Sequence, residues 1–209
     1  MQDRTKAILV TGANRGIGRA TVSAILDERD DTHVFLGSRV IAHGEGARED
    51  IVSERAGAGQ RVDVVQLDVS EDDSVREAAL SIESSLDGNP LYGIVNNAGV
   101  GDRGRSIEEV LDVNVYGPRR VCNAFLPLIE HPNGRVVNVA SASGPNFVAD
   151  CGPKYQELLT SPHITWEEIE AFMDACISTA HDAGEFDSTG IGNGSAYGLS
   201  KACLNAYTI

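Results

Sequence analysis

The sequence is poor in cysteine and holds none of the close cysteine pairs that bind metals or exchange electrons. Four cysteines occur among the 209 residues, and no two of them form a CxxC pair: Cys122, Cys151, Cys176 and Cys203. Zinc and redox motifs therefore have no support. The five histidines are scattered without metal-ligand spacing, so no metal site is predicted. We expect the cysteines to be reduced packing residues of an intracellular protein.

Long hydrophobic runs are also lacking. No apolar stretch approaches the roughly 18 residues that a membrane-spanning helix needs. The first residues, "MQDRTKAILVTGAN", reach a glycine too early for a secretory signal. We therefore expect a cytoplasmic protein with no membrane partner.

Positive charge is scarce. Lysine and arginine number 17 against 31 aspartates and glutamates, which gives a formal net charge of -14. Phosphate would repel such a chain, so nucleic acid and anionic membrane surfaces are poor partners. The excess of acid is interpreted as a means of solubility. A small anionic ligand can still bind in a local basic pocket.

What the sequence does contain is a regular alternation of short apolar runs with longer amphipathic stretches. The apolar runs are rich in valine, isoleucine and leucine, as buried parallel strands are, and they cover residues 6–12, 33–38, 61–68, 91–99 and 134–141. Strand–helix alternation implies right-handed βαβ units. The sequence predicts an α/β fold with a doubly wound parallel sheet in one domain over residues 1–209.

Two of the helices can be placed more closely. The stretch 17–28 has apolar residues near the helical period, from which we expect a buried face made of Ile17, Ala20, Ala24 and Ile25. Ser70, with Asp73 three residues later, is typical of a helix N-cap.

A glycine-rich turn follows the first predicted strand. In "TGANRGIG", residues 11–18, Gly12 permits a tight turn, whereas Gly16 and Gly18 allow a ligand or a neighbouring strand to come close. The helix that follows offers unpaired N–H groups and the positive end of its dipole. This arrangement predicts a cradle for the pyrophosphate of a dinucleotide, although the motif alone is also compatible with a plain turn.

Two arginines indicate which dinucleotide is bound. Arg15 lies inside the glycine-rich turn, and Arg39 follows the second predicted strand. In this type of fold the end of that strand meets the adenosine ribose, where an acidic residue selects NAD. Here Ser38 and Arg39 stand at that place instead, and two guanidinium groups suit a 2′-phosphate. NADP(H) is therefore favoured over NAD(H), the alternative being that both arginines only solvate loop ends.

Six motifs in order resemble those of the short-chain dehydrogenase/reductase family. They are "TGANRGIG" (11–18), "LDV" (67–69), "NNAG" (96–99), "VNVYG" (113–117), "SASG" (141–144) and "YGLSK" (197–201). The resemblance implies a Rossmann fold and a nicotinamide cofactor. A long insertion over residues 144–194 separates Ser141 from Tyr197, and this is similar to the monomeric NADPH-dependent carbonyl reductases. It implies hydride transfer from NADPH to an aldehyde, ketone or quinone.

The resemblance assigns four catalytic residues. Tyr197 and Lys201 are at i and i+4, so they share one face of a helix. A nearby ammonium favours the phenolate and so makes Tyr197 a general acid/base. By resemblance, Lys201 also holds the nicotinamide ribose, Ser141 bonds the substrate carbonyl, and Asn114 supports a proton relay through water to Lys201.

The resemblance also implies a set of cofactor contacts, to which Tyr197 and Lys201 belong: Gly12, Asn14, Arg15, Gly16, Ile17, Gly18, Arg39, Asp68, Val69, Asn96, Ala98 and Gly99. Asp68 would meet the adenine amino group and Val69 the adenine side. The alternative for Asp68 is a strand-end acid that caps the next turn. Asn96 is also compatible with a purely structural amide.

The insertion is expected to contain a helix from Thr165, as its cap, to near Gly184. Trp166 and Phe172 in this helix either line a substrate pocket or pack between helices. The insertion should cover the surface through which relatives dimerise, so a complete protein is expected to be a monomer.

Relatives continue beyond the catalytic lysine, which predicts that the sequence is truncated at its C-terminus, either as a fragment or as a naturally shortened product, and that its fifth strand lies at a sheet edge. The alternative to a reductase is a non-catalytic nucleotide-binding or regulatory relative, or an inactive fragment of the reductase.

Overall fold

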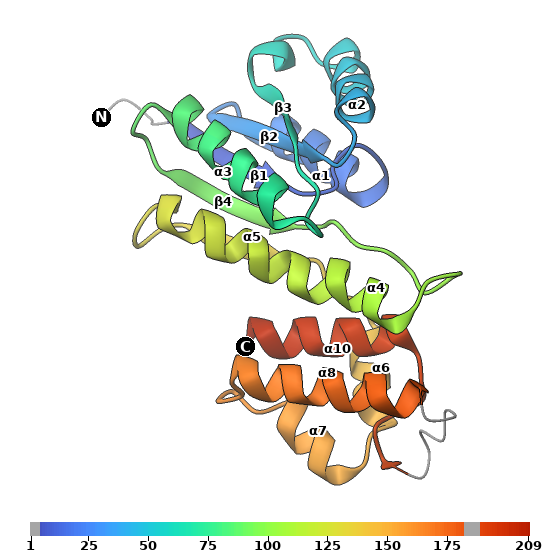
Figure 1. Cartoon of the computed structure of the whole chain (residues 1–209). Helices are drawn as coiled ribbons and strands as arrows, with labels where there is room; N and C mark the ends of the chain where they lie inside the picture. Colours follow the sequence, from blue (N-terminus) through green and yellow to red (C-terminus); the bar gives the residue numbers. More distant parts are fainter. Residues whose placement is uncertain (1–4, 182–188) are drawn as a thin grey trace. The chain divides into compact units, whose positions relative to one another are not determined.

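The chain forms two compact units. The computed structural model describes residues 5–181 and 189–209. One unit, here called the sheet unit, comprises Met1–Ala98 and Gly117–Val139. The other, the helical unit, comprises Gly99–Tyr116 and Ala140–Ile209 (Figure 1). The prediction of a single domain over residues 1–209 stays a prediction.

The sheet unit is built on five parallel strands in the order β3-β2-β1-β4-β5. The strands are β1 (Lys6–Val10), β2 (Thr32–Ser38), β3 (Val62–Gln66), β4 (Leu91–Asn96) and β5 (Arg135–Asn138). The strand order reverses at β1, between β2 and β4, and ligands bind at the carboxyl ends of strands beside such a point in sheets of this kind. The predicted doubly wound parallel sheet is confirmed.

Helices cover both faces of the sheet (Figure 1). They are α1 (Gly16–Glu28), α2 (Ile41–Glu54), α3 (Asp72–Leu86) and α5 (Gly117–Phe125). On the face covered by α1 and α2, one buried cluster joins both helices to the strands, with Val22 and Leu26 from α1, Ile51 from α2, and Val10 and Leu36 from the sheet. Burial of these apolar side chains holds the layers together.

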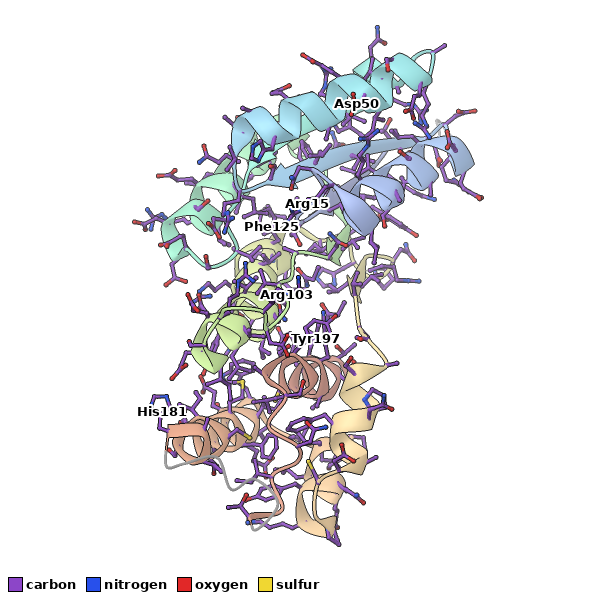
Figure 2. All side chains as sticks on the ribbon, turned by 90° about the vertical axis from the view of Figure 1, so that its right-hand side faces the viewer. Arg15, Asp50, Arg103, Phe125, His181 and Tyr197 are labelled. Carbon is purple, nitrogen blue, oxygen red and sulfur yellow. The ribbon has the colours of Figure 1, made fainter. Side chains whose placement is uncertain are left out.

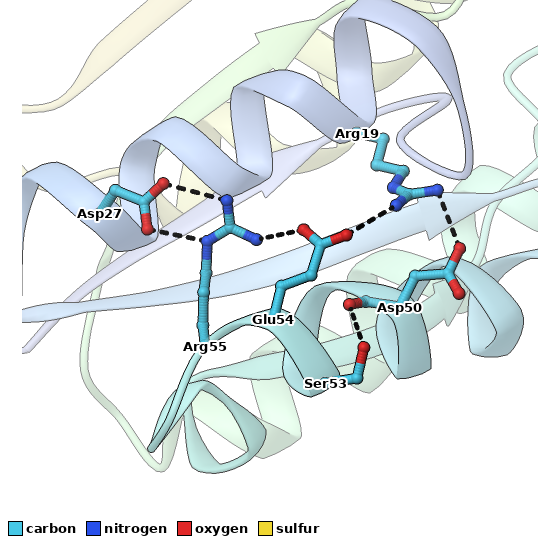
Figure 3. A network of polar contacts seen from close by, with 6 residues as sticks. All are labelled: Arg19, Asp27, Asp50, Ser53, Glu54 and Arg55. Carbon is cyan, nitrogen blue, oxygen red and sulfur yellow. Dashed lines mark hydrogen bonds and ion pairs between the residues drawn. The ribbon is translucent and has the colours of Figure 1, made fainter.

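A chain of ion pairs also joins α1 to α2 (Figure 3). Arg19 bonds Asp50 at 2.8 Å and lies 3.7 Å from Glu54. Arg55 contacts Glu54 at 3.0 Å and Asp27 at 2.7 Å, and this guanidinium lowers the pKa of the Asp27 carboxyl. Exposed ion pairs are individually weak, so the network sets the register of the two helices more than it adds stability.

The buried face of α1 differs from the predicted one. Ile17 is 68% exposed, and the buried residues of the helix are Gly18, Val22 and Leu26. Ala20 and Ala24 are exposed and Ile25 is half-buried. The predicted residues and the buried ones are both spaced at nearly the helical period, so periodicity alone could not show which set is buried. Gly18 decides the orientation, because its missing side chain lets α1 approach the turn before it.

The predicted cap of α3 is wrong. The N-cap is Glu71, which forms no capping hydrogen bond through its side chain. Ser70 instead donates its hydroxyl proton to Oδ1 of Asp68 at 2.6 Å. This hydrogen bond to a carboxylate is charge-assisted, and it places Ser70 in the turn after β3, one residue before the N-cap.

Strand β5 lies at an edge of the sheet, as expected. It pairs with β4 only, and its Val136 and Val137 are 37% and 50% exposed. In the described part of the chain no further strand covers its outer side.

The helical unit contains α4 (Ile107–Leu111), a π-helical turn (Asp112–Tyr116), α6 (Ser143–Ala149), α7 (Pro153–Leu159), α8 (Trp166–His181) and α10 (Ala196–Thr208). The insertion thus holds α6 and α7 besides the one helix that was expected. The cap at Thr165 is confirmed, since its Oγ1 accepts from the N–H of Glu168 at 3.2 Å. The predicted end near Gly184 lies outside the described residues.

One buried cluster forms the core of the helical unit. It contains three of the four cysteines, Cys151, Cys176 and Cys203, together with Phe172. All four cysteines are free and buried, as expected of packing residues. Burial raises the pKa of the Cys151 thiol to about 11 and raises those of the other two in the cluster. Trp166 packs edge-on against Tyr116 and Tyr207, which favours packing over a pocket wall.

Candidate active site

The turn between β1 and α1 needs two glycines for its backbone. Gly12 and Gly16 have φ angles of +61° and +56°, which L side chains rarely adopt. A Cβ on Gly12 would lie 2.8 Å from the Cα of Ala98, whereas one on Gly16 would meet nothing within 4 Å. Gly12 therefore permits close packing of the chain itself, and Gly16 faces open space that a ligand can use.

Two residues that the sequence analysis did not single out hold this turn. The Nδ2 of Asn97 donates to the carbonyls of Thr11 at 2.8 Å and Gly12 at 3.2 Å. The Oγ1 of Thr11 accepts from the N–H groups of Asn97 and Ala98, each at 3.0 Å. A Cβ on Gly18 would lie 2.4 Å from Nδ2 of Asn97. Gly18 is thus required because a side chain there would displace the amide of Asn97, whose hydrogen bonds to Thr11 and Gly12 fix the cradle in place.

The start of α1 is suited to an anion. Arg15 is its N-cap, gives no side-chain hydrogen bond to the helix, and the first turn carries no acidic residue. Arg15 is exposed and has no partner among the described residues. The first N–H groups of the helix and an unpaired guanidinium therefore lie together. Asn14 beside them is half-buried, and Ile17 is exposed.

The end of β2 carries Arg39 close to Asp68. Arg39 is exposed, and its Nε lies 3.9 Å from Oδ2 of Asp68. The other carboxylate oxygen accepts from the N–H and the hydroxyl of Ser70. Asp68 therefore makes the local turn contact of the alternative interpretation and also lies beside Arg39. Ser38 is buried, and its hydroxyl donates to the carbonyl of Val40 at 2.8 Å, which leaves Arg39 as the exposed polar group at this strand end.

The remaining predicted cofactor residues of the sheet unit are largely buried. Asn96 donates to Oδ1 of Asn138 at 2.8 Å and so joins β4 to β5, which is the structural role left open for it. Val69 is buried, and a Cβ on Gly117 would lie 2.9 Å from its Cγ2. Ala98 is half-buried beside the cradle, and Gly99 is exposed and belongs to the helical unit.

All four predicted catalytic residues lie in the helical unit. Helix α10 begins after Ser195, whose Oγ accepts from the N–H of Gly198 at 3.0 Å. One turn apart on this helix, the Nζ of Lys201 lies 5.8 Å from the centroid of the Tyr197 ring. Lys201 is only 5% exposed, and burial lowers the pKa of its ammonium. A buried cation thus lies beside a half-buried phenol.

Asn114 is held by its side chain. It lies in the π-helical turn, a form that is frequent at functional sites. Its Oδ1 accepts from the N–H of Val100 at 2.8 Å, and its Nδ2 donates to the carbonyl of Val100 at 2.9 Å and to Oγ of Ser200 at 3.0 Å. Ser200 is fully buried and donates to the carbonyl of Tyr197 at 2.8 Å. Ser200 is a further residue that sequence reasoning missed.

Ser141 precedes α6, which packs tightly on α10. Its Oγ accepts from the N–H of Ser143 at 3.2 Å and can still donate its own proton. A Cβ on Gly144 would lie 2.9 Å from the backbone carbon and oxygen of Lys201. The two helix backbones therefore meet at Gly144 and Lys201, and this contact fixes the segment of Ser141 relative to the Tyr197–Lys201 pair.

Among the described residues, no group of three or more histidines, cysteines or acids is placed to hold a metal ion. None of the described helices is both long and apolar enough to cross a membrane.

Known proteins match this chain over most of its length. Carbonyl reductase [NADPH] 1 of Sus scrofa is 32% identical over 96% of this chain and 68% of its own length. The mitochondrial D-beta-hydroxybutyrate dehydrogenase of Bos taurus is 33% identical over 86% of this chain and 51% of its own length. The chain thus spans about half the length of the latter relative and about two thirds of the former.

Solved structures show the same fold. The menthone neomenthol reductase of Mentha piperita superposes with a TM-score of 0.83 at 27% identity, over 98% of this chain and 84% of that one. The salutaridine reductase of Papaver somniferum gives a TM-score of 0.81 at 25% identity, over 97% and 80%. Residues 6–155 match the family described as short chain dehydrogenase. The chain, with its parallel sheet, glycine-rich cradle and Tyr–Lys helix, belongs to the short chain dehydrogenase family.

Proposed function

We propose that the protein is a carbonyl reductase that uses NADPH to reduce an aldehyde, ketone or quinone to the alcohol. The observation that carries this proposal is the burial of Lys201 beside Tyr197 on one face of α10. A buried lysine is expensive to keep, and burying one next to a phenol is typical of acid–base chemistry.

Tyr197 is the proposed proton donor to the carbonyl oxygen. Donation leaves a phenolate, and the ammonium of Lys201 stabilises that negative charge in surroundings with little water. Because burial lowers the pKa of Lys201, its ammonium is lost at a lower pH than that of an exposed lysine. The rate of the proposed reaction should therefore begin to fall at a lower alkaline pH than it would if Lys201 had the pKa of an exposed lysine.

Ser141 and Asn114 support this step in different ways. The hydroxyl of Ser141 is proposed to donate to the carbonyl oxygen, where negative charge develops. The side chain of Asn114 already bonds Val100 and Ser200 with both its atoms. Its contribution to a proton relay therefore comes from the backbone at the π-helical turn, with water completing the path to Lys201.

The cofactor is proposed to be NADP(H), which supplies the hydride when it is bound. The open space at Gly16 and the first N–H groups of α1 fit a pyrophosphate. Arg15 and Arg39 are proposed to hold the 2′-phosphate, and Asp68 and Val69 to meet the adenine. The exposure of Arg39 and the burial of Ser38 support this assignment, because Arg39 is then the exposed cationic group at the end of β2.

Two further proposals concern the state of the protein. We propose that it acts in the cytoplasm on a small-molecule substrate. We also propose that it is a monomer. The insertion over residues 144–194 supports the second proposal, and light scattering of the purified protein tests it. A stable dimer at micromolar concentration would contradict it.

The experiment for the main proposal measures loss of NADPH absorbance with a panel of aldehydes, ketones and quinones. NADH is run in parallel, and Tyr197→Phe serves as the inactive control. We expect NADPH-dependent reduction of at least one carbonyl by the wild type and none by the variant. Oxidation of neither cofactor with any carbonyl would refute the proposal.

A further inference from the structure

Cationic side chains without a partner are rare in this acidic protein. Against 31 acidic residues the chain has 17 lysines and arginines. Within the described ranges, the guanidinium groups of Arg15 and Arg103 have neither a hydrogen bond nor an ion pair nor a ring contact. Arg15 belongs to the proposed phosphate cradle of the sheet unit. Arg103 belongs to the helical unit, with the proposed catalytic residues.

Arg103 lies in a turn that is built to hold its shape. The N–H of Arg105 donates to the carbonyl of Asp102 at 3.1 Å, and Gly104 has a φ of +70°. The guanidinium of Arg105 bonds the carbonyls of Gly101 at 3.3 Å and Arg103 at 3.5 Å. The charge of Arg105 is therefore used within the turn, whereas that of Arg103 is not.

Both ends of this turn are fixed. At one end Val100 forms two hydrogen bonds with Asn114, which bonds Ser200 next to Lys201. At the other end Ser106 caps α4, accepting from the N–H of Glu109 at 3.2 Å and donating its own N–H to that carboxylate at 2.7 Å. The turn is thus held beside α10 at the end where Tyr197 lies, as both views show (Figures 1 and 2).

The acidic groups near Arg103 are mostly occupied. Glu109 bonds the N–H of Ser106, and Glu108 pairs with His181 at 2.7 Å. Asp102 is exposed and adjacent in sequence, and its carboxylate has no partner among the described residues. It forms no ion pair with Arg103, so the guanidinium keeps its full capacity for an external anion.

We propose that Arg103 is a substrate-recognition residue and that the preferred substrates are carbonyl compounds that also carry a carboxylate. A guanidinium binds a carboxylate through two parallel hydrogen bonds, which fixes orientation as well as position. The fixed turn means that little conformational freedom is lost on binding. This inference rests on the proposed carbonyl reductase activity for its choice of substrate, but the binding itself can be measured without turnover.

The first experiment measures binding by calorimetry with NADP⁺ present, so that no reduction takes place. The probes are para-formylbenzoate and its neutral methyl ester. We expect the wild type to bind the acid about three- to tenfold more tightly than the ester, a range that fits a charge-assisted pair between the carboxylate and the exposed Arg103. Arg103→Gln should abolish this preference, and Arg103→Lys should keep part of it. Asp102→Asn should increase it by removing a nearby negative charge.

Arg76→Gln is the matched control, because it removes an equally charged exposed side chain from the sheet unit. The proposal requires the preference to survive in this control. The proposal is overturned if the wild type shows no preference for the acid or if Arg103→Gln keeps that preference. It is also overturned if Arg103→Gln and Arg76→Gln lose the preference equally.

The second experiment compares kcat/KM for the two aldehydes with NADPH. Arg103→Gln should lower kcat/KM for the acid about three- to tenfold and leave the value for the ester unchanged. Reduction of neither aldehyde, with the binding preference intact, would refute the proposed reductase while leaving the anion site standing. Equal loss for both aldehydes would show that Arg103 acts on the fold and would overturn the inference.

Discussion

The side chain of Asn114 is joined to Ser200 by a hydrogen bond of 3.0 Å, in which the amide donates and the hydroxyl accepts. The same hydroxyl donates to the carbonyl of Tyr197 at 2.8 Å. Through this fully buried serine the π-helical turn, the loop after β4 and the first turn of α10 form one connected structure. Its position next to Lys201 makes Ser200 a positioning residue for the proposed proton donor.

Replacement of Ser200 by alanine should therefore lower kcat clearly while lowering the free energy of unfolding only slightly. Loss of the hydrogen bonds should cost about 1 kcal/mol of unfolding free energy, because Asn114 keeps its bonds to Val100. A small displacement of Tyr197 should lower kcat about tenfold, with KM for NADPH unchanged. Ser85→Ala, which removes a serine–carbonyl bond on an exposed helix face, is the control. Equal kinetics for the two variants would remove Ser200 from this role.

Gly144→Ala should separate α6 from α10. The added Cβ would lie 2.9 Å from backbone atoms of Lys201, which cannot move aside as a flexible side chain can. Overpacking of this kind costs about 1–3 kcal/mol, and we expect lower thermal stability together with loss of reduction.

Gly46→Ala is the matched control for this substitution. Gly46 lies exposed in α2, and a Cβ there meets nothing within 4 Å. Alanine is the better helix former, so this variant should be more stable by about 0.5–1 kcal/mol. A Gly144→Ala variant as stable and active as the control would contradict the close contact.

Arg39→Ala should shift the cofactor preference toward NADH. Removal of one charge-assisted contact should cost about 1–3 kcal/mol of NADPH affinity and leave NADH affinity nearly unchanged. Asp68→Asn provides the contrast, since it frees Arg39 from the carboxylate 3.9 Å away, and any loss through the proposed adenine contact should be equal for NADPH and NADH. Fluorescence titration of both cofactors measures these affinities. An unchanged ratio of the two affinities in Arg39→Ala would count against the assignment.

Lys201→Met should make the protein more stable at neutral pH, at the expense of activity. Burial disfavours the ammonium, so the pKa of Lys201 in the folded chain lies below its value in the unfolded chain. Between the two pKa values the unfolded chain binds more protons, and stability rises with pH there. The cost of the buried charge is thus fully present below the folded pKa and disappears as pH approaches the ordinary lysine value of about 10.4.

Urea unfolding of the wild type and Lys201→Met over this range checks the sign. The stability advantage of the variant should be largest near neutral pH and shrink as pH rises. An advantage that grows with pH would show that Lys201 is not held against its charge.

The sheet and the cradle could be read from the sequence because local patterns specify them. Runs of valine, isoleucine and leucine mark the strands, and Gly12 and Gly16 mark backbone angles that other residues resist. The ion pair of Arg39 with Asp68 depends on the parallel register of β2 and β3, in which Ser38 lies opposite Gln66. The residue types at these positions do not specify that register, so the ion pair could not be predicted from the sequence.

The remaining parts depend on contacts between distant residues. Asn97 and Ser200 carry ordinary side chains, and only the tertiary structure brings them to Thr11 and Asn114. The buried side of α1 was missed because two apolar series compete at one period. Helices α6 and α7 have seven residues each, with glycine and proline in or next to their first turns, so they lack the long periodic pattern that made α8 recognisable.

The most direct test of the proposed reaction follows the hydride and the proton together. The wild type and Tyr197→Phe are supplied with NADPH deuterated at its transferable position and with a carbonyl compound, and the alcohol is analysed by mass spectrometry. The phenylalanine ring still packs but lacks the proton, so cofactor binding should persist while product formation stops. We predict a singly deuterated alcohol from the wild type and none from the variant, with equal NADPH affinity for both. Deuterated alcohol formed at a similar rate by Tyr197→Phe, or no deuterium in the product of the wild type, would contradict the account.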